Sequence, residues 1–128
     1  MANRRFFQFR MSAQRDVVDL SAKVAIGATG APTLSLTDAK GIASVTRNSA
    51  GNYTVKLQDN YAALMSASVT MLNATVSAAP ASQLISEQVA SATLPQLVIQ
   101  CLSPAGIATD PDNGATLLIS VMLRNAST

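Results

Sequence analysis

The sequence predicts an all-β protein, a single antiparallel β-sandwich or jelly-roll-like domain that follows an extended N-terminal arm. Apolar and polar residues alternate through several short runs, which is the period of half-buried strands. Gly, Pro and Asn separate these runs, and the helices of roughly 10 to 15 residues that a parallel α/β sheet needs between strands are not indicated. Because 128 residues fit one domain, we expect the arm over residues 1–15 and the sandwich over residues 16–128.

The first predicted strand covers residues 18–26. Every second residue there is apolar, namely Val18, Leu20, Ala22, Val24 and Ile26. A helix would gather Val17, Leu20 and Val24 but scatter the others, so the strand is favoured. After a loop at residues 27–32, Leu34 and Leu36 alternate with hydroxyl residues and predict a second short strand.

A hairpin is the clearest local prediction. Residues 42–46 and 53–57 flank the segment 47–52, whose Gly and Asn residues tolerate positive φ and let the chain reverse. Residues 59–64 then predict a single turn or short helix, capped by Asp59 or Asn60, with Tyr61 packed beneath it.

Four more strands are expected in the second half of the chain. They cover residues 66–71, 84–89, 97–102 and 116–123, and the second of them has a poor alternation pattern. The last has apolar residues on both faces, with Leu118 and Met122 opposite the inward row. We therefore expect this strand at the centre of a sheet or at a subunit interface.

The residue types needed for most catalytic sites are missing or scattered. Histidine is absent, which removes the commonest general base and the commonest metal ligand. Seven carboxylates remain, and nothing in the sequence selects a pair for acid–base chemistry. We expect no enzyme active site and no cofactor.

Three local motifs also favour structural interpretations. Residues 110–114 resemble the start of a calcium loop, but their glycine is one position early and Val121 stands where the bidentate Glu belongs, so a turn is favoured. The glycines at residues 27–30 precede Ala31 and Pro32 and not the Lys and Ser/Thr of a phosphate loop. Cys101, at an alternating apolar position, is interpreted as a buried, inert thiol.

The cysteine count and the lack of long apolar runs indicate the expected compartment. A single cysteine forms no internal disulfide, so folding needs no oxidising environment. The sequence shows no apolar run of a signal peptide and no stretch near the ~20 apolar residues of a membrane span. We expect a soluble chain without a membrane partner.

The arm has the most unusual local composition in the chain and is the predicted partner-binding site. It holds every Phe of the chain beside three arginines: Arg4, Arg5, Phe6, Phe7, Phe9 and Arg10. Such residues anchor protein interfaces, and an extended arm would put Phe7 and Phe9 on one side. A first core strand with solvated arginines explains them equally well. Stacking on single-stranded nucleic acid is disfavoured, because the net charge is only +2 and no wider basic groove is indicated.

Only 12% of the residues are charged, about half the usual share. A surface this poor in charge suits a protein covered by copies of itself or by a larger assembly. We therefore expect an oligomer.

Five segments together resemble small virion structural proteins of tailed bacteriophages. They are FFQFR at residues 6–10, DLSAKVAIGATGAPT at 19–33, KGIAS at 40–44, RNSAGNYTVKL at 47–57 and ATDP at 108–111. Size and composition suggest capsid decoration, the cement type, as the role within that group. The resemblance implies a β-rich homotrimer, made in the host cytoplasm, that sits on the outer capsid surface of the virion and binds the major capsid protein.

Two other functions remain open. A tail or fibre component of the same virion would share this composition. A carbohydrate-binding β-sandwich usually presents exposed aromatic rings over a groove, and two Tyr without Trp argue against it.

Overall fold

The computed structural model describes residues 17–35, 39, 41–73, 75 and 79–124. Eight strands and a short 3-10 helix follow one another in this part of the chain. They are β1 (Val17–Ile26), η1 (Ala28–Gly30), β2 (Pro32–Leu34), β3 (Ile42–Ser49), β4 (Asn52–Leu57), β5 (Ala63–Leu72), β6 (Ala81–Glu87), β7 (Gln96–Leu102) and β8 (Thr116–Arg124). The predicted arm, residues 1–15, lies outside the described residues.

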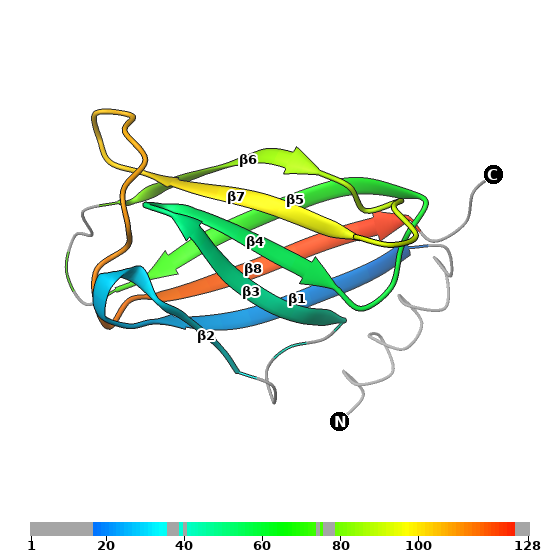
Figure 1. The fold of residues 1–128 in the computed structure, drawn as a ribbon, viewed down its shortest axis with the longest axis horizontal. Coiled ribbons are helices and arrows are strands. Elements are labelled where there is room, and N and C mark those ends of the chain that lie inside the picture. The colour runs from blue at the N-terminus through cyan, green and yellow to red at the C-terminus, as the bar shows by residue number, and fades with distance from the viewer. Residues whose placement is uncertain (1–16, 36–38, 40, 74, 76–78, 125–128) are drawn as a thin grey trace, which may run out of the picture.

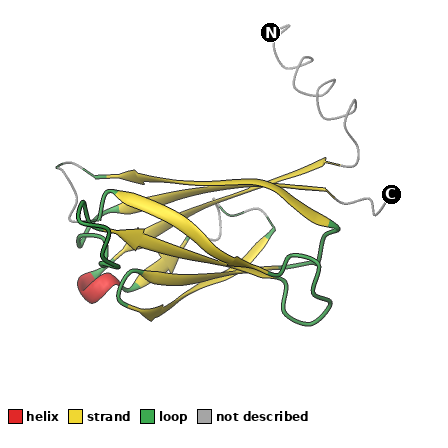
Figure 2. Ribbon diagram, turned by 90° about the horizontal axis from the view of Figure 1, so that it is seen from above, coloured by secondary structure: helices red, strands yellow, loops and turns green. Residues whose placement is uncertain are grey.

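The strands form two four-stranded sheets that lie face to face (Figures 1 and 2). One sheet has the order β2-β1-β8-β5 and the other β3-β4-β7-β6, and every strand pair is antiparallel. The predicted single-domain antiparallel β-sandwich is therefore confirmed. The two-faced apolar strand, β8, lies centrally between β1 and β5, as its sequence predicts.

Alternation builds the core. In β1 and β8, every second residue is buried and its neighbours are more exposed, so each strand turns one apolar row toward the opposite sheet. The strands β4 and β7 do the same from the other side. The largest fully buried side chains are Tyr53, Ile42, Leu97, Leu117, Leu123, Val24, Val55, Val89, Val121 and Cys101.

The predicted hairpin is confirmed, but its connection is much shorter than the six residues expected. β3 runs to Ser49 and β4 begins at Asn52, which leaves only Ala50 and Gly51 for the reversal. Gly51 has a φ of 69°, a conformation that costs a residue with a side chain but not glycine. A bulge between Arg47 and Ser49 absorbs the extra residue.

Two other expectations need correction. Residues 59–64 form neither a helix nor a single helical turn; the backbone N–H of Tyr61 donates to the Val89 carbonyl over 2.8 Å, and Ala63 already begins β5. The strand expected at residues 84–89 is β6, which begins at Ala81 and ends at Glu87. Its seven residues are all exposed, so burial imposes no alternation that the sequence could reveal.

Candidate interaction surface

The strands β5 and β6 end their respective sheets on the same side of the sandwich (Figure 1). Within the described residues, each pairs with one neighbour only, β8 and β7 respectively. Such edge strands present backbone N–H and C=O groups that another chain can pair with. We call this side of the molecule, formed by Ala63–Leu72 and Ala81–Glu87, the β5–β6 edge.

The β5–β6 edge is apolar and nearly uncharged. β5 contains no charged residue, and β6 contains only Glu87 at its end. Large apolar side chains are nevertheless exposed on both strands: Met65 by 53%, Leu72 by 58%, Leu84 by 38% and Ile85 by 44%. Natural edges usually carry Lys, Pro or inward-pointing charges that discourage pairing. On β5 and β6 the one such charge is Glu87, which pairs with the buried Leu97 at the end of β6.

Each of these strands also contains a bulge at a large apolar residue. The register shifts between Leu64 and Ser66 in β5 and between Leu84 and Ser86 in β6, so Met65 and Ile85 are the extra residues. A bulge leaves its extra residue out of the ladder and redirects the side chain. Because the two strands run in opposite directions from the contact between Val69 and Ser82, both bulges lie toward the same end of the edge.

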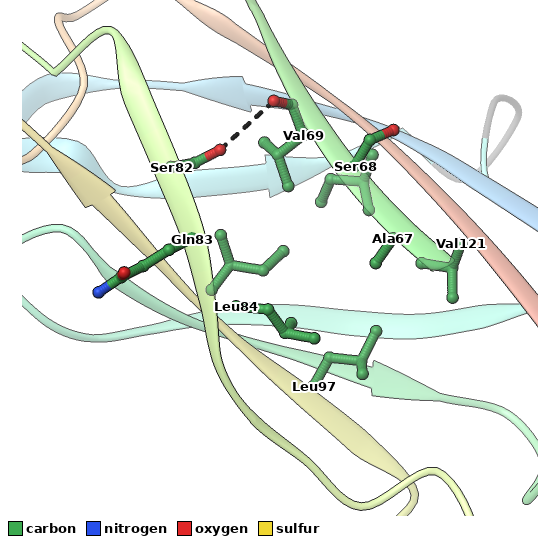
Figure 3. A pocket seen from close by; sticks show the side chains of 10 residues that line it. Ala67, Ser68, Val69, Ser82, Gln83, Leu84, Leu97 and Val121 are labelled. Carbon is green, nitrogen blue, oxygen red and sulfur yellow. Dashed lines mark hydrogen bonds between the residues drawn. The ribbon is translucent and has the colours of Figure 1, made fainter. Parts of the chain in front are cut away.

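A cleft of about 260 Å³ opens between the two strands (Figure 3). Its lining residues come from both sheets and are Ala67, Ser68, Val69, Ser82, Gln83, Leu84, Leu97, Ile99, Ile119 and Val121. The last four belong to the buried core on β7 and β8. The cleft therefore leads from the surface directly to core side chains, and no charged residue lines it.

Small residues at inward positions explain the cleft. Ala67 pairs with the buried Val121, and Ser82 pairs with the buried Cys101, so both point toward the space between the sheets. Packed sheets lie about 10 Å apart, a gap that two small side chains cannot fill. The Ser82 hydroxyl donates to the Val69 carbonyl over 3.4 Å, a long and weak bond across the opening (Figure 3).

A polar cluster at the loop end of the sandwich is the other candidate site. Arg47 holds Asp110 in a bidentate ion pair, with Nε–Oδ1 and Nη2–Oδ2 distances of 2.9 and 2.7 Å. The Gly51 N–H also donates to Asp110 Oδ1 over 2.8 Å. The hydrogen bond from Arg47 is the main cause that holds the pKa of the Asp110 carboxyl below its usual value.

The same cluster fastens three loops to one another. The buried Tyr53 hydroxyl donates to the Gly30 carbonyl over 2.8 Å, and burial chiefly raises its pKa to about 12. The Cys101 N–H donates to the Gly51 carbonyl, and the Thr109 N–H donates to the Cys101 carbonyl. Its thiol is buried, as predicted, and burial raises its pKa to about 11. These groups already have partners, so the cluster explains loop structure and leaves no open site.

The residues predicted to bind a partner belong to the N-terminal arm. Arg4, Arg5, Phe6, Phe7, Phe9 and Arg10 lie outside the described residues. In the segment 110–114 the expected turn is formed by Asn113 and Gly114, with the Ala115 N–H donating to the Asp112 carbonyl over 3.1 Å. Within the described ranges, no three His, Cys, Asp or Glu side chains gather as metal ligands would, and no helix has the length and apolar character of a membrane span.

Sequence reasoning missed the β5–β6 edge. It placed Ala67, Val69 and Met71 on one face of a strand but did not show that this strand ends its sheet. The available signal was the lack of charge over residues 63–72 and 81–86 together with two small residues at inward positions.

Comparisons with known proteins add no relative. No protein-family model, curated protein or solved structure matches this chain.

Proposed function

We propose that this chain is a non-enzymatic virion structural protein that decorates the outer capsid lattice of a tailed bacteriophage and stabilises the head. The observation that carries the proposal is the β5–β6 edge, a nearly uncharged apolar surface that opens into the core. A lone domain in water gains nothing from leaving such a surface bare. A subunit that is covered in an assembly gains binding energy from it.

The sequence resemblance supplies the particular assembly. Its segments 19–33, 47–57 and 108–111 include the loops that meet at the Arg47–Asp110 cluster. A rigid sandwich with fixed loops suits a subunit that must repeat the same contacts many times. A trimer that spans several copies of the major capsid protein would bind with an avidity that no single contact supplies.

The alternatives differ in what they require of the surface. A carbohydrate-binding module needs exposed rings over a groove, yet Tyr53 is fully buried and Tyr61 is partly buried against the core. A tail or fibre component needs the same protein contacts as a capsid subunit. Within the virion, location is therefore the question that separates the candidates.

Binding to particles that lack the protein tests the proposal. Purified chain is mixed with undecorated heads and, separately, with tails of the parent phage, and bound protein is measured by co-sedimentation. We expect saturable binding to heads and a regular array on the capsid by electron microscopy. Binding to tails alone would support the tail component instead, and binding to neither would refute a virion surface role.

The arm can be tested in the same assay. Deletion of residues 1–10 is expected to weaken head binding by orders of magnitude, because a buried Phe contributes roughly 1.5 to 3 kcal/mol and Arg pairs bidentately with carboxylates. Replacement of Arg4, Arg5 and Arg10 by Ala should matter less as salt rises, since screening already weakens exposed pairs. Wild-type occupancy by the truncated chain would show that the arm is not the anchor.

A further inference from the structure

We infer that the cleft in the β5–β6 edge receives the N-terminal arm of a second copy of this chain. Residues 6–9 of the donor run as a strand along β5, and Phe7 and Phe9 enter the cleft. The inference rests on the proposed function, in that it names the contact by which the structural subunit assembles with itself. It also gives the aromatic half of the arm a site separate from the arginines.

The cleft suits aromatic rings. Its floor consists of Leu97 and Ile99 from one sheet and Ile119 and Val121 from the other, all nearly inaccessible to water. Polar groups occur at its sides, and no charged group has to be desolvated when a ring enters. Rings that fill it would restore the close packing that the two small inward residues leave incomplete.

The spacing of donor and acceptor also agrees. In an extended strand Phe7 and Phe9 point to the same side, about 7 Å apart. The inward positions of the cleft have this same two-residue spacing, with Ala67 and Val69 on β5 and Ser82 and Leu84 on β6. An arm beside β5 would use backbone groups that now lack a neighbouring strand, which is the β-augmentation mode of peptide binding.

The direction of β1 indicates that the donor is another copy. Val17 and Ala63 both pair with Arg124, from opposite sides of β8, so the chain before Val17 leaves the sandwich at the end where β5 begins. To lie beside β5 of its own sandwich it would have to pass β8 and β5, three strand spacings or about 14 Å, and reverse its direction. The connecting residues 10–16, RMSAQRD, contain no Gly or Pro, and Ser12 and Asp16 are the residues among them that favour a turn. A neighbouring molecule can accept the arm without such a reversal of the chain.

This contact is heterologous, because an arm on one subunit meets a cleft on another. Heterologous contacts form rings when the rotation between subunits closes and open chains when it does not. A closed ring of three gives the trimer that the sequence resemblance implies. Each subunit in the ring donates one arm and receives one.

Sedimentation of the full-length chain tests the donor side. Replacing Phe7 and Phe9 together by Ala is expected to weaken self-association by about 100-fold or more, since two buried rings are lost. Phe6→Ala is the matched control, because residue 6 points to the other side of the arm, and should change association by less than about tenfold. The inference would be overturned if Phe6→Ala and the double variant weakened self-association equally. It would also be overturned if neither variant weakened it.

A variant that fills the cleft from within tests the acceptor side. Ala67→Phe should make the chain monomeric at concentrations where the wild type associates, while its melting temperature stays the same or rises. Thr70→Phe is the control, since Thr70 lies on the outward face of the same strand. Undiminished association of a folded Ala67→Phe variant would overturn the inference.

Cross-linking decides between an arm from a neighbour and an arm from the same chain. One chain carries Phe9→Cys and another carries Ser82→Cys, and both also carry Cys101→Ala, because Cys101 lies directly opposite Ser82 in the strand pair and would compete for the new thiol. Oxidation of the mixture should give a covalent heterodimer. If the mixture gives none and a chain with both substitutions closes an internal disulfide, the arm folds back and the inference is wrong.

These measurements need no capsids, so they fail independently of the proposed function. Self-association through the cleft without head binding would leave the inference standing and remove the decoration role. Head binding by a chain that stays monomeric at all concentrations would support the decoration role and overturn the inference.

Discussion

The loop end of the sandwich and the β5–β6 edge differ in whether their groups are paired within the chain. At the loop end, Arg47, Asp110 and Gly51 satisfy one another, and Tyr53 is tied to the Gly30 carbonyl. At the β5–β6 edge, large apolar side chains are exposed, and neither strand has a second neighbouring strand among the described residues. The difference separates the part of the molecule that holds the fold from the part that is available for binding.

A pair of leucines gives the most direct test of this difference between the core and the β5–β6 edge. Leu97 on β7 is fully buried, and Leu97→Ala should cost about 2 to 5 kcal/mol of the free energy of unfolding. Leu84→Ala at the β5–β6 edge removes the same atoms from a side chain that is 38% exposed and should cost about 1 kcal/mol or less. Urea unfolding of both variants measures the difference. Equal costs would mean that the edge belongs to the stabilising core.

Two glycines sharpen the description of the loop end. A Cβ on Gly51 would lie 2.6 Å from the Thr109 nitrogen and 2.7 Å from the Cys101 carbonyl oxygen, both backbone atoms that cannot move away cheaply. We expect Gly51→Ala to cost about 2 to 4 kcal/mol. Gly106 also has positive φ but has no atom within 4 Å of an added Cβ, so Gly106→Ala should cost about 1 kcal/mol. Thermal unfolding that ranks Gly106→Ala as the more damaging change would contradict the tight packing of this loop end.

Cys101 lies at the loop end but pairs in register with Ser82 of the β5–β6 edge. Because its side chain is a small buried apolar group, Cys101→Ala should cost about 1 kcal/mol of stability. Self-association and head binding should stay at wild-type levels, which sedimentation and co-sedimentation measure. Loss of either one with unchanged melting would place the thiol at the interface. The wild-type thiol should also resist alkylation at pH 8 in the native state, since burial raises its pKa to about 11.

The ion pair at the loop end should have the smallest effect, because both side chains are partly exposed and water screens them. The folded state lowers the pKa of Asp110, so its contribution is present above the ordinary carboxyl pKa and is lost as pH falls through the lowered value. Asp110→Asn should therefore be less stable than wild type at neutral pH, and the two melting temperatures should converge in acid. A difference that stays constant down to the lowest pH would show that the charge of Asp110 contributes nothing.

The sequence predicted best where burial is one-sided along a strand. In β1, β4, β7 and β8, an inward row alternates with an outward one, so composition repeats with the period of the structure. β6 and the segment 59–64 were predicted poorly for one shared reason. All of β6 is exposed, and the Tyr61 N–H donates to the carbonyl of Val89, a residue distant in the sequence, so neither segment carries a local pattern that reveals its conformation.

By itself, then, the sequence determined the fold class, the inward rows of the central strands, the presence of a hairpin between β3 and β4 and the burial of Cys101. Only the tertiary structure decided that β5 and β6 are the edge strands, that Ala67 and Ser82 leave a cleft between them, and that Arg47 meets Asp110 across 63 positions of sequence. The physical reason is that alternation is a property of one strand, whereas an edge, a cleft and an ion pair depend on which distant strands pair. That pairing is set by the packing of the whole chain.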